Sequence, residues 1–246
     1  MSAHISASNP TRAASARVSA PVYVYHLPVR LWHWVTVFAI VTLSVTGFLI
    51  ADPPWPVLLG QPSNLFLMGD IRVTHFIAGD VLAVALLVRM YWAVVGNRYE
   101  REIFMPAIWR VRWWRGLLRT IRWYLFLERE TPREIGHNPL EQIAMFVMFT
   151  LGVLFEIVTG FALYGQGTGY GTWAYELFTS WVVPLFGNGQ ILHTWHHLGM
   201  WYLIVFSMVH VYMTIREDIM ARYSVMSTMF SGWRFFKDDR DEGESE

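Results

Sequence analysis

Residues 193–210 read HTWHHLGMWYLIVFSMVH and contain four histidines but no lysine, arginine, aspartate or glutamate. The surrounding apolar run, about 191–215, is long enough to cross the hydrocarbon core of a bilayer as a helix, which takes roughly 20 residues. A polar side chain within such a span is costly, so it usually faces the interior of a helix bundle and has a function. The stretch therefore predicts a membrane helix that carries functional imidazole groups.

Helical spacing divides these histidines into two kinds. At 100° per residue, His196 and His210 lie 14 positions apart and share one helix face to within about 40°. His193 and His197 diverge from His210 by about 100° and 140°, so we expect them at the surface or behind the ligands. Fourteen residues cover roughly 21 Å along a helix axis, too far for one metal ion to bridge. Two separate sites are therefore expected, one near each membrane surface.

The rest of the chain has the composition of a membrane protein. Of its 246 residues, 54% are hydrophobic and only 15% are charged, far from the balance of an ordinary soluble domain. Three further apolar segments, at about 31–51, 73–95 and 142–164, are also long enough to span a bilayer. We therefore expect an all-α integral membrane protein, in which residues 1–246 form a single four-helix transmembrane bundle.

The loops predict how this bundle is oriented. Loop 96–141 contains nine arginines, whereas the other two loops, 52–72 and 165–190, contain almost no basic residues. By the positive-inside rule the arginine-rich loop is cytoplasmic and the other two are periplasmic, and four spans then leave both termini in the cytoplasm. The first twenty residues lack the apolar core of a signal peptide, so we expect no cleavage, and the acidic tail 238–246 is expected to be a solvated terminus.

Two of the loops contain amphipathic helix patterns. In loop 96–141 the basic and apolar side chains fall on different faces, as on a helix lying on anionic lipid, with a solvated basic face as the alternative. The residues are Arg112, Arg115, Arg119 and Arg122 on one face and Trp114, Leu117, Leu118, Ile121 and Leu125 on the other. Loop 165–190 has the spacing of an interfacial helix, or of a docking surface, at Trp173, Leu177, Phe178, Trp181 and Val182.

Each of the two expected sites needs a ligand from a second helix. His33 begins the first span at the cytoplasmic surface, level with His210, and His75 begins the second span at the far surface, level with His196. Two neutral imidazoles without a thiolate or carboxylate beside them suit haem b, whose porphyrin supplies four further nitrogen ligands, whereas zinc would want about four protein donors. The chain has no cysteine, which excludes covalent haem attachment and iron–sulfur clusters held by this chain. Two non-covalent haem b groups are therefore expected.

Small and basic residues occur where these haems would need them. Gly47 lies at the depth of the far site and Gly79 lies one turn from the ligand of its own span, so a porphyrin could approach the backbone there. Arg89 lies at the depth of the cytoplasmic haem, where it could pair with a propionate. Arg30 and Arg72 each precede a proposed ligand by three residues and suit propionates at the interface. For Arg30 the alternative is a snorkelling basic residue.

Two segments resemble the signature segments of the b-type cytochrome subunit of nickel–iron hydrogenases. They are residues 30–47, RLWHWVTVFAIVTLSVTG, and residues 193–210, and the resemblance covers roughly residues 23–222. It implies a four-helix bundle in the bacterial inner membrane with two b haems, whose ligands fall on His33, His75, His196 and His210. It also implies partners: a small iron–sulfur subunit on the periplasmic side, through it the large nickel–iron subunit, and quinone as the electron acceptor.

The same resemblance points to a quinone contact at the start of the third span. Residues 136–142, GHNPLEQ, resemble the place where such proteins keep quinone-contacting polar residues, here His137, Asn138 and Gln142. The alternative is that Asn138 is a helix N-cap followed by Pro139 at the first helical position. Further along the span, Glu156 is expected to reach the membrane interface, with a buried functional acid as the alternative.

Other functions predict different properties. The membrane subunit of formate dehydrogenase shares the expected architecture and is the nearest rival. A metal-ion transporter using intramembrane histidines would have no haem and would need a continuous polar path. An intramembrane metalloprotease is disfavoured because HTWHH lacks the glutamate of the HExxH motif. We therefore expect an electron-transfer and anchor subunit that is not an enzyme by itself, with membrane lipid but no nucleic acid among its partners.

Overall fold

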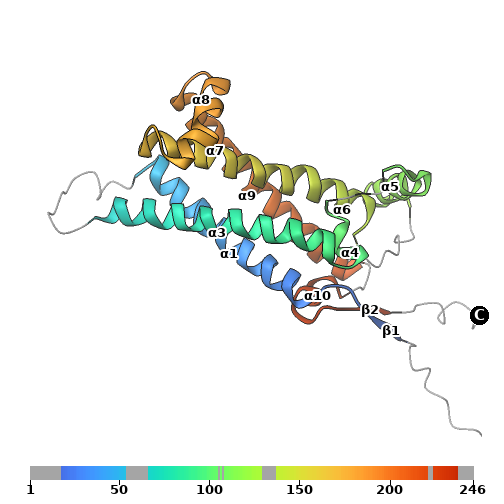
Figure 1. Cartoon of the computed structure of the whole chain (residues 1–246). Helices are drawn as coiled ribbons and strands as arrows, with labels where there is room; N and C mark the ends of the chain where they lie inside the picture. Colours follow the sequence, from blue (N-terminus) through green and yellow to red (C-terminus); the bar gives the residue numbers. More distant parts are fainter. Residues whose placement is uncertain are drawn as a thin grey trace, which may run out of the picture.

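Four long apolar helices form the body of the protein (Figure 1). The computed structural model describes residues 18–53, 66–104, 106, 108–128, 137–220 and 224–237. The long helices are α1 (Leu27–Ala51), α3 (Leu67–Val95), a composite helix over Pro139–Thr168, and α9 (Gly189–Met220). Each predicted span lies within one of them, and all four are long and apolar enough to cross a membrane. The chain is a multi-pass helical membrane protein.

The composite helix consists of three pieces in direct succession: α6 (Pro139–Ile143), the π-helical η1 (Ala144–Thr150) and α7 (Leu151–Thr168). It begins with a capping box, in which the Asn138 side chain accepts from the Glu141 N–H at 2.9 Å. In return the Glu141 carboxylate accepts from the Asn138 N–H at 3.0 Å. Two of the N–H groups that every helix start leaves unpaired are thus satisfied, and the expected N-cap is present.

Apolar side chains cover both the inside and the outside of the bundle. The core combines side chains from all four long helices, namely Ala39, Leu82, Leu86, Phe149, Val153, Leu203 and Phe206. On the outer surface, Phe38 is 67% exposed and Leu87 is 65% exposed. Because lipid tails are as apolar as these side chains, such a surface is stable in a bilayer, which agrees with the predicted fold class.

The two ends of the chain meet in a small sheet that the sequence did not predict. Strand β1 (Val18–Tyr23) pairs antiparallel with β2 (Trp233–Lys237), which follows the short helix α10 (Val225–Ser231). Figure 1 places this sheet at the end of the bundle that also carries α4 (Arg98–Arg101) and α5 (Val111–Tyr124). Four spans return the chain to its starting side, so the ends can pair. The expectations for the first seventeen residues and for the tail 238–246 lie outside the described residues.

Helix α5 has one more face than the sequence pattern indicated. The four expected arginines are exposed, as are Trp114 and Leu118 of the predicted apolar face. A third face, formed by Trp113, Leu117, Thr120 and Trp123, is buried. It packs on α6, where the Pro139 side chain would lie 3.2 Å from a Cβ added at Gly116. Leu117 therefore belongs to the protein interior and not to the membrane-facing side.

At the opposite end of the bundle, between α7 and α9, lie the π-helical η2 (Tyr175–Thr179) and α8 (Ser180–Phe186) (Figure 1). The expected amphipathic helix again divides into two faces. Val182 is buried against Ala162 and Leu192, with Phe178 packed on the same cluster. Three other predicted residues stay exposed: Trp173, Leu177 and Trp181. The buried face fixes the segment to the bundle, and the exposed face is left for lipid or protein.

Candidate functional site

The structure brings His75 of α3 and His196 of α9 together. Their ring centroids lie 6.4 Å apart, with the ring planes at 77° to each other. Both residues lie toward the end of the bundle that carries α8. The other two histidines of this part of α9 lie elsewhere: His193 is exposed, and His197 accepts a hydrogen bond from the Trp201 indole N–H at 3.1 Å. The helical spacing in the sequence had also selected His196 from these three neighbouring histidines.

A threonine hydroxyl contacts the Nδ1 atom of each of these imidazoles. Thr46 Oγ1 lies 2.9 Å from His75 Nδ1, and Thr159 Oγ1 lies 2.8 Å from His196 Nδ1. Each hydroxyl has a shorter contact with a carbonyl of its own helix than with the imidazole. Thr46 donates to the Thr42 carbonyl and Thr159 to the Phe155 carbonyl, both at 2.7 Å. The hydroxyl oxygen can then only accept from an Nδ1–H. This geometry favours the Nδ1–H tautomer, in which the Nε2 lone pair of both rings is free.

A glycine follows each of these threonines and lies against the same imidazole. A Cβ added at Gly47 would lie 3.3 Å from His75 Cε1, and one added at Gly160 would lie 3.3 Å from His196 Cε1. Both pairs occur within the sequence Val-Thr-Gly-Phe, at 45–48 in α1 and at 158–161 in α7. This repeated tetrapeptide was missed in the sequence analysis, although it was the signal that could have identified Thr46, Thr159 and Gly160.

The sequence predicted that Glu156 would reach the membrane interface, but in the structure Glu156 is turned inward. Its side chain is 11% exposed, and its Oε2 lies 3.1 Å from His196 Nδ1. The other carboxyl oxygen contacts Gly199 of α9 and has no hydrogen-bond partner among the described residues. The helix turn between Glu156 and Thr159 explains this position, because residues three apart face the same way. The two imidazoles of this pair therefore have different surroundings, with a carboxyl group beside His196.

The second pair lies toward the other end of α1 and α9. This pair consists of His33 of α1 and His210 of α9. Phe206 stacks on the His210 ring at 5.8 Å, and Trp34 meets the His33 ring edge-on at 5.2 Å. His33 Nδ1 is buried and has no hydrogen-bond partner within the described part of the chain. Unlike the first pair, this pair has an imidazole nitrogen that no threonine holds.

Arg89 is a buried cation near this second pair. Its side chain is 1% exposed and lies over the rings of Trp32 and Phe104, 5.3 Å from each centroid. One guanidinium nitrogen donates to the Glu100 carbonyl, but Nε and NH1 have no partner among the described residues. A buried guanidinium with two unused donors is costly, so this site is suited to an anionic group in addition to the nearby Glu100.

The other residues predicted to surround a cofactor, Gly79, Arg72 and Arg30, have different surroundings in the structure. Gly79 faces open space, which leaves room for a large group. Arg72 is exposed at the end of α3 near α8. Arg30 donates to the Phe230 carbonyl and lies beside Gly232, so part of its guanidinium already holds the C-terminal segment in place.

His137, Asn138 and Gln142 lie together at the arginine-rich end of the bundle. The Gln142 amide donates to the His137 carbonyl at 2.9 Å and accepts from the Trp113 indole at 2.8 Å, while Asn138 caps α6. The His137 ring contacts the Tyr25 hydroxyl at 3.2 Å. Burial lowers the pKa of His137 to about 3, helped by the nearby positive charge of Arg234, so its imidazole is neutral at pH 7.

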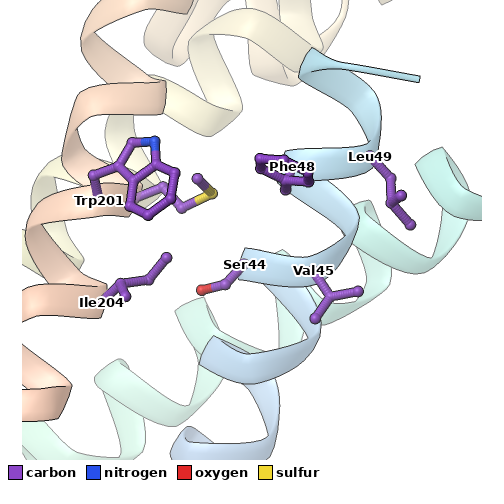
Figure 2. Close-up of a pocket in the computed structure, with 7 residues that line it drawn as sticks. Ser44, Val45, Phe48, Leu49, Trp201 and Ile204 are labelled. Atoms are coloured by element: carbon purple, nitrogen blue, oxygen red, sulfur yellow. The ribbon is translucent and has the colours of Figure 1, made fainter. Parts of the chain in front are cut away.

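The donor set fits haem b and does not fit a simple metal ion. Within the described residues, no group of three or more histidine, aspartate and glutamate side chains could hold a metal. What is present is a pair of neighbouring imidazoles, 6.4 Å apart between ring centroids, with glycines where side chains would crowd the rings. An apolar groove between α1 and α9 adjoins this pair and is lined by Ser44, Val45, Phe48, Leu49, Met200, Trp201 and Ile204 (Figure 2). Apolar walls beside paired histidines suit a porphyrin ring.

Comparison with known proteins places these features in a family. The model of the family described as prokaryotic cytochrome b561 matches residues 24–232. The chain is 56% identical over 224 residues to the "Probable Ni/Fe-hydrogenase B-type cytochrome subunit" of Azotobacter chroococcum mcd 1, covering 91% of this chain and 92% of that protein. It is 52% identical to the protein of that name from Rhizobium leguminosarum bv. viciae, with 89% and 91% covered. It is 48% identical to the "Probable Ni/Fe-hydrogenase 1 B-type cytochrome subunit" of Escherichia coli K12, with 87% and 91% covered.

Proposed function

The chain belongs to the prokaryotic cytochrome b561 family, and we propose that it is the membrane cytochrome b subunit of a nickel–iron hydrogenase. In this role it anchors the enzyme to the bacterial inner membrane through the small iron–sulfur subunit, which in turn carries the large subunit. It passes electrons from hydrogen oxidation to quinone. The chain makes and breaks no bonds of the substrate, so it is an electron-transfer subunit and not an enzyme by itself.

The observation that carries this proposal is the neighbouring pair of imidazoles, 6.4 Å apart, each with a threonine hydroxyl at Nδ1 that favours a free Nε2. His75 and His196 would be the axial ligands of one haem b, and His33 and His210 those of a second. Haem b supplies one-electron oxidation and reduction without proton transfer at the protein ligands. At the pair His75 and His196 the chain would hold each ring in one orientation, favour an unprotonated Nε2 and surround the site with apolar side chains, which exclude water.

Basic residues would bind the haem propionates. Arg89 is the strongest candidate, because its buried guanidinium has two donors without a partner among the described residues. Arg30 and Arg72 have the expected positions, but Arg30 already donates to the Phe230 carbonyl. Gly47 and Gly79 would leave space for the porphyrin itself.

The two sites define an electron path across the membrane. With loop 96–141 and both termini in the cytoplasm, His75 and His196 lie near the periplasmic side, where the partner's iron–sulfur chain would end. His33 and His210 lie about 21 Å further along α9, toward the cytoplasm. Quinone would accept electrons there, near His137, Asn138 and Gln142. Of these three, His137 has the most hydrogen-bonding capacity left, because both amide side chains already bind within the protein.

The rival functions have less support. The relatives compared above are named for hydrogenase and not for formate dehydrogenase. A histidine-based metal-ion transporter would need a polar path through the membrane, whereas the core between the two histidine pairs is a cluster of apolar side chains.

Haem content of single-residue variants tests the proposal. The purified protein should contain two low-spin, non-covalent b haems per chain. His196→Ala or His75→Ala should remove one and His33→Ala or His210→Ala the other, whereas His193→Ala and His197→Ala should retain both. The measurement is the reduced-minus-oxidised spectrum together with the extractable haem-to-protein ratio. A ratio near zero in the unaltered protein would overturn the proposal, and haem loss in His197→Ala but not in His196→Ala would show that the ligand is wrongly assigned.

A further inference from the structure

The Glu156 carboxyl group lies inside the bundle, at the contact between α7 and α9. Its side chain is 11% exposed, and Oε2 lies 3.1 Å from His196 Nδ1. Among the described residues no lysine or arginine forms an ion pair with it, and Oε1 has no hydrogen-bond partner there. Because a carboxyl group loses its hydration when it is buried within a span, an acid kept at this position is expected to have a function.

Gly199 of α9 provides the space that this carboxyl group occupies. A Cβ added at Gly199 would overlap Glu156 Oε1 and would lie 2.9 Å from the carboxyl carbon. Gly199 follows His196 by three residues, so the histidine and the glycine lie on the same face of α9. Any other amino acid at position 199 would push the carboxyl group away from its present place.

The helix pair α1 and α3 has the same arrangement of threonine and histidine but lacks the acid. In α1 the residue three positions before the threonine is Leu43, where α7 has Glu156. In α3 the residue three positions after the histidine is Ala78, where α9 has Gly199. The acid and the glycine that admits it therefore occur together beside one imidazole, and both are replaced beside the other.

The carboxyl group gives His196 a second oxygen near Nδ1. Thr159 Oγ1 lies 2.8 Å from this nitrogen and Glu156 Oε2 lies 3.1 Å from it, and both distances are within the range of a hydrogen bond. Oε2 can accept from an N–H whether the carboxyl group is ionised or carries a proton on Oε1. Because partners of this kind raise the basicity of a ligating histidine, His196 should be a stronger donor through Nε2 than His75.

We propose that Glu156 is a positioning residue for His196, admitted to its place by Gly199, and that it lowers the midpoint potential of the haem that His196 would bind. That haem, with His75 as its other ligand, is here called the far haem. A stronger axial donor stabilises the oxidised iron more than the reduced iron, which gives the direction of the effect. The inference rests on the proposed ligation of the far haem by these two histidines.

Optical redox titration of the membrane-bound holoprotein tests the effect of the acid. Glu156→Leu, which copies the residue of the other helix pair, should raise the ratio of reduced to oxidised far haem at a fixed ambient potential by up to about 5-fold, the value of one hydrogen bond. This is a rise of about 40 mV, because a tenfold change corresponds to about 59 mV for a one-electron couple. Glu156→Gln keeps an oxygen acceptor and should restore most of the original ratio. The haem of His33 and His210 is the internal control and should not shift in either variant.

Gly199→Ala tests the same contact without changing the acid. The added methyl group would displace the flexible end of Glu156, so the far haem should shift in the same direction as in Glu156→Leu. Gly152→Ala is the matched control, because Gly152 also lies between α7 and α9 but its added Cβ would lie 3.0 Å from Leu203 and 3.1 Å from Tyr202 instead. The far-haem potential should stay near its original value in this control.

Haem content separates this inference from the proposed function. Absence of haem from the unaltered protein would overturn the proposed function, whereas full haem content with an unshifted far haem in Glu156→Leu would overturn only the role of the acid. Equal shifts in Glu156→Gln and Glu156→Leu, or a shift in Gly152→Ala as large as in Gly199→Ala, would also overturn that role. Where Glu156→Leu does not retain the far haem, the milder Gly199→Ala variant decides, and an unshifted potential there contradicts the inference.

Discussion

Thr46 and Thr159 are the residues that control the far histidine pair most directly. Each hydroxyl donates a hydrogen bond to a carbonyl of its own helix, and its oxygen accepts one from an imidazole of a neighbouring helix. The hydrogen bond selects the Nδ1–H tautomer and raises the basicity of Nε2, as partners of ligating histidines do in other metal sites. His33 Nδ1 has no such partner within the described residues, so at the two proposed haem sites the histidines would be unequal donors.

Removal of these hydroxyls should shift one haem and leave the other unchanged. In Thr46→Val the His75 imidazole loses its hydroxyl acceptor, so Nε2 would become a weaker donor and the oxidised iron would be less well stabilised. In Thr159→Val the effect should be smaller, because Glu156 Oε2 remains 3.1 Å from His196 Nδ1. The midpoint potential of the far haem should therefore rise, by up to about 40 mV if the full value of one hydrogen bond of about 1 kcal/mol is lost. Optical redox titration measures both potentials separately.

The matching serine variants supply the control. Thr46→Ser and Thr159→Ser keep the hydroxyl and lose only a methyl group, so the far-haem potential should stay near its original value. Equal shifts of both haems, or equal effects of valine and serine, would mean that the threonines act only through packing.

The start of the third spanning helix shows how one element can have two interpretations. Asn138 and Glu141 form a reciprocal cap, Pro139 occupies the first helical position, and Gln142 joins the His137 carbonyl to the Trp113 indole on α5. These bonds attach the arginine-rich loop to the bundle. They account for Asn138 and Gln142 without a ligand, and they leave the His137 ring in contact with the Tyr25 hydroxyl and near the Glu102 carboxylate.

Quinone turnover in variants of this helix start should separate the cap from a quinone contact. In a double variant, Asn138→Leu with Gln142→Leu, a contact role predicts that hydrogen-dependent reduction of both haems survives while reduction of a quinone analogue falls. Loss of the cap alone should lower stability by about 1 kcal/mol, which thermal unfolding measures.

Asn138→Asp is the control for this experiment, because aspartate caps a helix as well as asparagine does but cannot donate through an amide. If quinone turnover in the double variant equals that of the unaltered protein, the two residues do not belong to the quinone site and their role is structural.

At the scale of the whole molecule, the bundle consists of two similar antiparallel helix pairs. Helix α1 supplies Thr46 and Gly47 to a histidine of α3, and α7 supplies Thr159 and Gly160 to a histidine of α9. Each helix pair thus contributes one imidazole whose Nδ1 contacts a threonine, and the candidate site lies where the two helix pairs meet. The second histidine pair comes from α1 and α9 instead and lacks this repeated support.

The orientation of the molecule predicts which loops thiol reagents can reach. Since positively charged loops stay in the cytoplasm, Arg115→Cys on α5 should resist a membrane-impermeant maleimide in intact spheroplasts and react after permeabilisation. Tyr170→Cys, at a position 85% exposed at the other end of the bundle, should react in intact cells. The native chain has no thiol to interfere. Labelling of Arg115→Cys in intact spheroplasts would reverse the orientation and with it the order of the two haems.

The sequence by itself determined the spanning helices and predicted that His196 would face His75. Long apolar runs predict spanning helices because lipid requires every backbone hydrogen bond to be made within the segment, and a fixed rotation per residue shows which histidines share a face. Helix phase thus selected His196 over its neighbours, and the capping pattern identified Asn138.

Only the tertiary structure decided which side chains meet across helices. The contacts of Thr46 and Thr159 with the imidazoles, the inward turn of Glu156 and the pairing of β1 with β2 each join residues far apart in the chain. Periodicity describes one helix at a time, so it cannot show the partner that a face meets.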